Sequence, residues 1–213
     1  MTRSADATVG APRATGSART VLPAQAVLLV AAVALVGFGG VGRAALCLAL
    51  VPALWLPTAL QHSTAVLFPR WLHVAYAVFI LAGPFVGGAL NAYTALPGWD
   101  KAVHAYSGLL VGWGALFAVR ASRIARVLRF PLLVVIILSA VMATAAAWEI
   151  CEFTSDSLVG THAQHGNTDT MTDIISATIG GVTVLLTLRR TGRPRPLPET
   201  SATSSPSHRP PHY

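Results

Sequence analysis

Carboxylate side chains are scarce in this sequence, and most of them fall within one part of the chain. The residues between positions 100 and 173 carry six of the eight Asp and Glu residues, namely Asp100, Glu149, Glu152, Asp156, Asp169 and Asp173. The other two, Asp6 and Glu199, lie near the ends of the chain. Carboxylates close together must be neutralised by a bound cation, by shared protons or by water. The clustering therefore predicts a polar site.

The spacing of these residues is that of a helix face. Helical spacing relates three groups: Asp100 with His104, Asp169 with Asp173, and Glu149 with Glu152 and Asp156. Residues three or four apart lie on the same side of an α-helix. If each group is helical, three helix ends each present one polar stripe, and together they can form a shared site.

The elements that would carry these stripes are membrane helices. The 213-residue chain is 54% hydrophobic and only 11% charged, with a mean hydropathy of +0.60, whereas soluble proteins average about 25% charged residues. A membrane span needs roughly 20 apolar residues. The sequence predicts an all-α, polytopic transmembrane helical bundle with six spans, at residues 23–40, 44–60, 71–90, 102–119, 130–148 and 171–188. The second span is the least regular because it contains Pro52 and Pro57.

The transmembrane domain is predicted to occupy residues 21–190. Residues 1–20 have the composition of a disordered, basic N-terminal tail, and residues 191–213 that of a disordered tail rich in Pro and Ser. Pairs of small residues four apart, which favour close helix packing in membranes, occur at Gly108 and Gly112, Ala143 and Ala147, and Ser176 and Gly180.

The basic residues predict the orientation of the bundle. With both termini in the cytoplasm, thirteen of the fifteen Arg and Lys residues fall on the cytoplasmic side, and only Arg43 and Lys101 fall outside. Short loops rich in these residues stay cytoplasmic. The net charge of +7 thus reflects topology, and nucleic acid is not a predicted partner, since no soluble domain carries a basic face. The acidic groups are predicted at the outer surface.

Three segments, WDKAVHAYSG, WEICEF and GNTDTMTDIISATIGG, resemble the YjdF-type family of bacterial inner membrane proteins, a domain of unknown function, over roughly residues 71–181. The chain is more distantly similar to the VanZ-like superfamily, named for proteins associated with teicoplanin resistance. The resemblance implies a multi-pass protein of the bacterial plasma membrane, and it implies no established reaction. Its pattern maps onto Asp100, His104, Gly108, Glu149, Glu152, Asp169, Thr170, Asp173 and Gly180. The chain departs from the pattern at residues 166–168, where a loop is one residue shorter.

Three functions remain open from the sequence. The first is an outward-facing divalent metal site for Mg, Mn or Zn, with a metal-dependent enzyme acting on a lipid-linked or cell-envelope substrate. Its candidate ligands and catalytic groups are Asp100, His104, Glu149, Glu152, Asp169 and Asp173. The second is an ion- or proton-coupled transporter. The middles of the spans contain no acidic or basic residue, which argues against a pathway across the membrane. The third is an accessory or scaffold protein in which the polar groups lock the bundle.

Further residues near these groups have simpler interpretations. His162 and His165 lie in a Gly-flanked loop and are predicted to be solvent-exposed. Trp99 and Trp148 are predicted to anchor helices at the membrane surface. Lys101 could either bind an anionic group or pair with a neighbouring carboxylate. The lipid bilayer is the predicted partner, and the sequence identifies no small molecule or protein.

Overall fold

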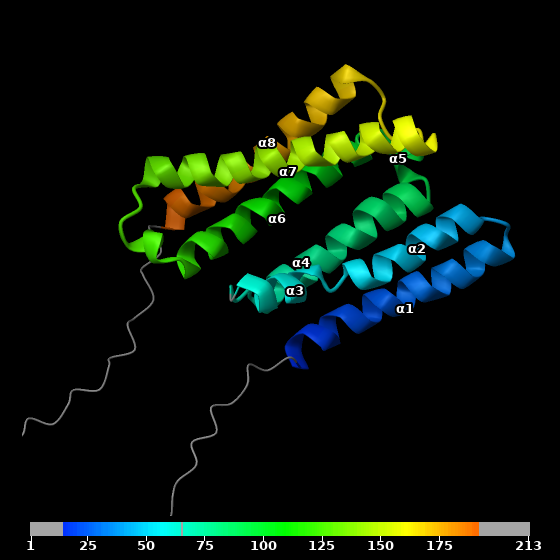
Figure 1. Ribbon diagram of the computed structural model, residues 1–213, viewed down its shortest axis with the longest axis horizontal. Helices are drawn as coiled ribbons and strands as arrows, with labels where there is room; N and C mark the ends of the chain where they lie inside the picture. The colour runs from blue at the N-terminus through cyan, green and yellow to red at the C-terminus, as the bar shows by residue number, and fades with distance from the viewer. Residues whose placement is uncertain (1–14, 65, 192–213) are drawn as a thin grey trace, which may run out of the picture.

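The computed structural model describes residues 15–64 and 66–191, which form helices and short connections (Figure 1). In chain order the helices are α1 (Thr15–Gly37), α2 (Val41–Ala53), α3 (Leu56–Thr64), α4 (Arg70–Ile80), η1 (Leu81–Ala89), α5 (Ala92–Ala95), α6 (Trp99–Ala121), η2 (Arg123–Arg126), α7 (Phe130–Val159) and α8 (Asn167–Thr191). Of these, η1 is a π-helix and η2 a 3₁₀-helix. The predicted tails lie largely outside the described residues, although residues 15–20 belong to α1.

The predicted polytopic helical bundle is confirmed. Five helical stretches are long and apolar enough to cross a membrane, and a sixth apolar helix, Val21–Gly37, is shorter. The five stretches are Val41–Thr64, Arg70–Ala89, Trp99–Ala121, Phe130–Val159 and Asn167–Arg190. The start of α1 and the end of α8 lie on the same side of the bundle (Figure 1), as six crossings require.

Two spans of the N-terminal part are interrupted. Between α2 and α3 the chain passes through Leu54 and Trp55, next to Pro52, and Trp55 N donates to the Pro52 carbonyl at 3.0 Å. The next span changes from α4 to the π-helix η1, which contains Pro84. Proline removes a backbone donor and crowds the preceding turn, so helices bend or change their pitch near it.

The helix that carries the Glu residues is longer than its predicted span. The sequence placed the end of that span near Trp148, whereas α7 continues to Val159 and ends at Gly160, which has a left-handed φ of 72°. Glycine adopts this conformation without steric cost and commonly ends helices. Glu149, Glu152 and Asp156 therefore lie on one continuous helix.

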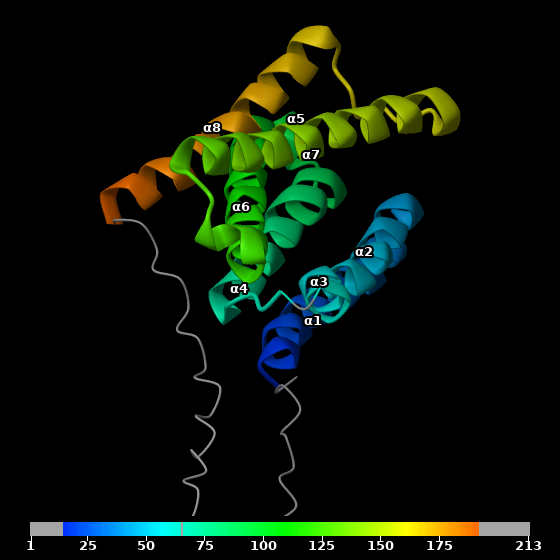
Figure 2. The ribbon, with the colours of Figure 1, turned by 60° about the vertical axis from the view of Figure 1, so that its left-hand side comes forward.

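Two hydrophobic cores divide the bundle. The first joins side chains of α1, α2, α4 and η1, with Leu28, Cys47 and Ala89 fully buried in it. The second joins α6, α7 and α8 around Leu116, Ile137 and Val184. Figure 2 shows α1 and α2 packed together and well separated from α7 and α8. We refer to residues 15–98 as the N-terminal half and to residues 99–191 as the C-terminal half.

Candidate functional site

Glycines fix the distance between α6 and α8. A Cβ atom added at Gly108 would lie 1.9 Å from the carbonyl oxygen of Ala177, and one added at Gly180 would lie 2.0 Å from that of Ala105. Backbone therefore meets backbone at this crossing. His104 precedes Gly108 by one turn and Asp173 precedes Ala177 by one turn, so the same contact holds these two polar side chains against each other.

The small-residue pairs predicted from sequence have different outcomes. Gly108 and Gly112 are buried in the helix interface, as is Gly180. Ala143 and Ala147 are exposed, and the prediction that they form a packing surface is wrong. The buried stripe of α7 consists instead of Ile137, Val141, Ala145 and Glu149. The rotation of α7 about its axis determines which of its residues are buried, and the small size of Ala143 and Ala147 does not indicate that rotation.

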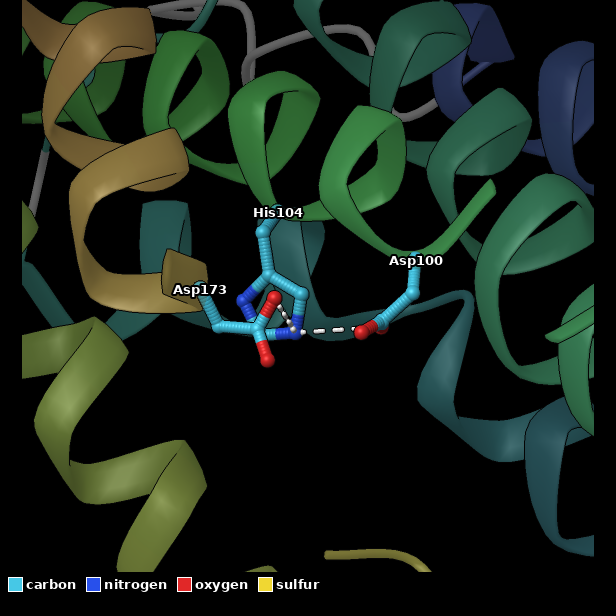
Figure 3. A group of neighbouring side chains, drawn as sticks. All are labelled: Asp100, His104 and Asp173. Carbon is cyan, nitrogen blue, oxygen red and sulfur yellow. Dashed lines mark ion pairs between the residues drawn. The ribbon is translucent and has the colours of Figure 1, made fainter. Parts of the chain in front are cut away.

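Two aspartates and a histidine meet beside this crossing (Figure 3). Asp100 and His104 lie on the first turns of α6 and Asp173 lies on α8. His104 Nε2 is 3.5 Å from Asp100 Oδ1 and 3.9 Å from Asp173 Oδ1. One donor atom from each of the three residues lies within 4.8 Å of the other two. Asp173 is only 1% exposed and His104 is 7% exposed, so the group is largely withdrawn from water.

Lys101 pairs with carboxylates, which is one of the two roles left open by the sequence. Its Nζ lies 2.5 Å from Asp169 Oδ1, 2.7 Å from Asp173 Oδ1 and 3.0 Å from Asp100 Oδ2. The ammonium therefore links the start of α6 to the start of α8. A buried carboxylate is strongly destabilising without a partner, and Lys101 supplies the nearest positive charge to Asp173.

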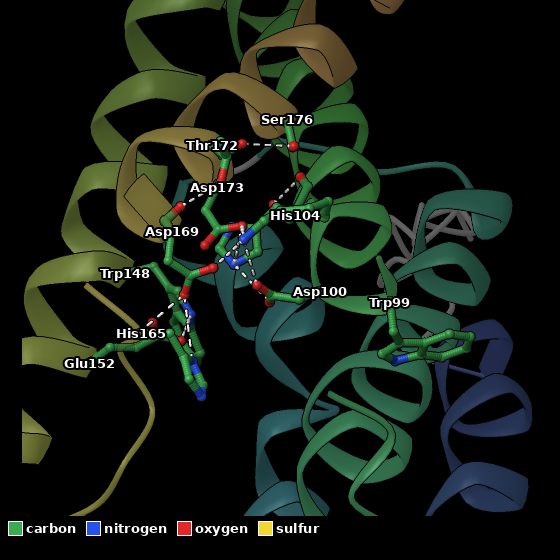
Figure 4. Close-up of polar contacts among 12 residues, drawn as sticks. Trp99, Asp100, His104, Trp148, Glu152, His165, Asp169, Thr172, Asp173 and Ser176 are labelled. Atoms are coloured by element: carbon green, nitrogen blue, oxygen red, sulfur yellow. Dashed lines mark hydrogen bonds and ion pairs between the residues drawn. The ribbon is translucent and has the colours of Figure 1, made fainter. Parts of the chain in front are cut away.

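Asp169 joins the site through Lys101 and not through the three-donor group. Its other oxygen, Oδ2, is 3.6 Å from Nδ1 of His165. Figure 4 draws both side chains. The His165 side chain is 70% exposed, in agreement with the solvent-exposed position predicted for it, and His162 is also exposed.

The two glutamates approach from α7. Glu149 is 4% exposed, and neither of its carboxylate oxygens has a hydrogen-bond partner in the described part of the chain. Glu152 is half-buried, and its Oε1 accepts a hydrogen bond from Trp148 Nε1 at 2.8 Å (Figure 4). The negative charges of Glu149 and Asp100 oppose the charge of Glu152, and a charge on His104 would favour it. Trp148, predicted as a surface anchor, thus also orients a carboxylate.

Asp156 continues the same stripe but has a structural role. Its Oδ1 accepts hydrogen bonds from Thr161 Oγ1 at 2.5 Å and from Ala163 N at 2.9 Å, and its Oδ2 accepts one from Gln164 N at 3.0 Å. These bonds hold the loop that leads to α8. Asp156 is therefore already satisfied by the loop.

Sequence analysis missed Tyr93, on the short helix α5. Burial, together with the negative charges of Asp100, Glu152 and Asp173, raises the pKa of Tyr93 above its ordinary value. The phenol therefore stays protonated. Its ring lies against Gly87, where an added Cβ would be 2.4 Å away. Helix α5 has only four residues, so Tyr93 gives no periodic signal in the sequence.

Trp99 lies at the start of α6 and connects it to the N-terminal half. Its indole Nε1 donates to the Ala82 carbonyl in η1 at 3.0 Å, and Figure 4 shows the ring directed away from the acidic groups. Half-buried, Trp99 holds the first turn of α6 in place. This is a more specific role than the surface anchor predicted for it.

Chemically, the Asp100, His104 and Asp173 group could bind a metal. Carboxylate oxygen and imidazole nitrogen are ordinary ligands of Mn²⁺ and Zn²⁺, and carboxylate also suits Mg²⁺. Metal–ligand bonds of about 2.0–2.2 Å require the three donors to move closer together. Side-chain rotation can supply that movement, although Lys101 would have to leave Asp173 when a cation binds there.

The fold and the site define a polytopic helical membrane protein with a buried polar group at one end of its C-terminal half. The chain belongs to the family described as predicted membrane protein (DUF2238), which matches residues 22–193. That match covers both halves of the bundle, and the description names a membrane location without a reaction. Neither the curated proteins nor the solved structures gave a match to this chain.

Proposed function

We propose that this protein binds a divalent cation through Asp100, His104 and Asp173, and that it is a metal-dependent enzyme acting on a lipid-linked or cell-envelope substrate. The observation that carries the proposal is that three donor atoms, contributed by two helices, lie within 4.8 Å of one another. Two of the residues are buried and the third is half-buried. A metal site needs carboxylate and imidazole ligands that surround one position and are shielded from bulk water.

Mn²⁺ and Zn²⁺ suit this donor set better than Mg²⁺. Mg²⁺ prefers oxygen ligands and retains several waters, whereas an imidazole favours the more polarisable ions. Bound to such an ion, His104 would be neutral and the aspartates ionised. The ion would polarise a substrate oxygen or activate a water molecule for attack.

Lys101 supports an anionic substrate. A cation at Asp173 would compete with the ammonium for Oδ1, where Lys101 now lies at 2.7 Å. Lys101 can remain paired with Asp169, at 2.5 Å, or turn toward a negatively charged group of the substrate. A metal ion together with a lysine is a suitable pair for binding a phosphate or a carboxylate.

The proposed location is the outer side of a bacterial plasma membrane. The distribution of Arg and Lys supports cytoplasmic termini, and the six acidic residues of the described chain lie at the opposite end of the bundle. The resemblance to YjdF-type and VanZ-like proteins supports the same location. A substrate attached to a membrane lipid could reach this end of the bundle from the outer leaflet.

Metal analysis of the purified, full-length protein tests the proposal. Protein in detergent micelles would be stripped with chelator, incubated with Mn²⁺ or Zn²⁺, desalted and analysed by mass spectrometry. Wild type should retain stoichiometric metal, and Asp173→Asn should lose it. His162→Gln is the matched control, since it removes an exposed possible ligand at the same end of the bundle, outside the three-donor group.

Metal-free wild type, or equal metal in wild type and folded Asp173→Asn, would refute the proposal. Proton-dependent uptake in vesicles without bound metal would instead favour a transporter. Lower bundle stability in Asp173→Asn with neither metal nor transport would favour a scaffold, in which Lys101 and the aspartates serve only to fasten α6 to α8.

A further inference from the structure

Glu149 is a buried carboxylate for which the described chain provides no hydrogen bond. It is 4% exposed, and both of its oxygens are buried without a hydrogen-bond partner among the described residues. A buried carboxylate needs hydrogen-bond donors or a positive charge beside it to offset its lost hydration. The three contacts of Lys101 go to aspartates and leave Glu149 without that charge.

Glu149 lies on the face of α7 that packs against α6 and α8. It continues the buried stripe of Ile137, Val141 and Ala145, which faces α6 and α8. Its negative charge acts on His104 across the helix interface. Glu152 follows one turn later on α7 and is half-buried. Two carboxylates of α7 therefore lie one turn apart beside the interface of α6 and α8.

The balance of charge exceeds what one divalent ion can neutralise. Five carboxylates, Asp100, Glu149, Glu152, Asp169 and Asp173, are accompanied by one ammonium, Lys101. Four negative charges then remain when His104 is neutral. One divalent ion compensates half of them and two compensate all, which matters in a partly buried site at the end of a membrane bundle.

We propose that Glu149 and Glu152 hold a second divalent cation beside the first, so that the loaded site contains two metal ions. This inference rests on the proposed function of the Asp100, His104 and Asp173 group. A pair of adjacent cations binds an oxyanion between them and stabilises the attacking and leaving oxygens of a displacement reaction. The substrate class is therefore a phosphate ester or another oxyanion-containing group carried by a lipid or envelope component.

A Mn²⁺ titration followed by electron paramagnetic resonance tests the second ion. Chelator-stripped, full-length protein in detergent micelles should bind about two Mn²⁺ per chain and give a spin-coupled signal from neighbouring ions. Glu149→Gln should bind about one Mn²⁺ and give an uncoupled spectrum. His162→Gln should behave as wild type, because His162 is exposed and lies outside the proposed ligands.

The outcomes separate this inference from the proposed function. Wild type that binds one ion, lost in Asp173→Asn and kept in Glu149→Gln, would refute the second position and leave the first intact. Wild type that binds no ion would refute both. Two ions retained in Glu149→Gln would place the second elsewhere, and complete loss of metal in folded Glu149→Gln would indicate one shared ion. Either result overturns the two-ion site.

A second variant keeps the test valid if Glu149→Gln does not fold. Glu152 is half-buried and lies nearer the end of α7, so Glu152→Gln is the milder substitution. It should weaken binding of the second ion at least about tenfold while the first ion stays bound. Unchanged affinity for both ions in Glu152→Gln would contradict the assignment, and melting temperature would establish that each variant is folded.

Discussion

The two halves of the bundle pack by different means. The N-terminal half has no acidic residue between positions 15 and 98, two of its spans are interrupted, and hydrophobic side chains fill its core. The C-terminal half contains all six acidic residues of the described chain. Its helices α6, α7 and α8 are continuous, and α6 and α8 meet through glycine. Three of the four buried polar or charged side chains in the described residues belong to this half.

This contrast shows what a polar site in a membrane bundle requires. Ionisable groups withdrawn from water need partners at fixed distances, because the surrounding lipid offers none. Direct backbone contact between α6 and α8 fixes those distances more tightly than flexible side chains could. The N-terminal half supports α6 from outside, where Tyr106 Oη donates to the Ala75 carbonyl at 3.0 Å.

Gly108→Val is expected to have the largest effect. Its added carbons would meet the Ala177 backbone, which cannot move without separating α6 from α8. The free energy of unfolding in detergent should fall by about 3 kcal/mol. Gly114→Val on the same helix is the control, since a Cβ there meets nothing within 4 Å. Equal stability of the two variants would show that the glycine contact does not hold α6 against α8.

Lys101→Met is expected to have the next largest effect. It leaves the Asp173 carboxylate, 1% exposed, without its nearest positive charge. In the presence of chelator the free energy of unfolding should fall by about 2 kcal/mol. This loss is smaller than that for a fully buried ion pair because Lys101 is partly exposed. Addition of Mn²⁺ should restore the lost stability, since the ion replaces the ammonium. Lys101→Arg should stay close to wild type. A variant insensitive to Mn²⁺ would contradict competition between lysine and metal.

Gly87→Ala tests whether the N-terminal half tolerates crowding better. The new Cβ would lie 2.4 Å from the Tyr93 ring, but a side chain at the edge of the bundle can turn away where backbone cannot. A loss of about 1 kcal/mol is expected. The adjacent Gly88→Ala should be close to neutral, because its Cβ meets only the end of the Leu46 side chain, at 3.3 Å. Thermal unfolding of both variants measures the difference, and a loss as large as that of Gly108→Val would remove the contrast.

Gln25→Leu is expected to have the smallest effect. Gln25 Nε2 donates to the Val51 carbonyl at 3.1 Å and so joins α1 to α2. Side-chain hydrogen bonds between membrane helices contribute about 0.6 kcal/mol on average, and unfolding should become easier by about that amount. Tyr76→Phe removes the corresponding bond to Ala53 and should match it. Loss of metal binding in either variant would show that the two halves are coupled more strongly than their separate cores suggest.

Much of the fold followed from the amino-acid sequence. Apolar runs predicted the helical membrane bundle. The predicted fifth span ended at Trp148, and the spacing of Glu149, Glu152 and Asp156 predicted one shared stripe on the condition that the helix continued, as α7 does. The pairing of Asp100 with His104 was likewise visible from spacing, since residues four apart share a helix face. These features are local, and a single chain segment contains all the information that they need.

The composition of the site was decided by tertiary structure. From sequence alone, six residues were equal candidates. Packing of α6 against α8 selected Asp100, His104 and Asp173 as the three-donor group.

The same packing directed Lys101 toward three aspartates and left Glu149 buried without a hydrogen bond from the described chain. Spacing along one helix tells which side chains share a face. Which face meets which neighbour depends on the rotation and approach of separate helices, and contacts such as Gly108 with Ala177 determine both.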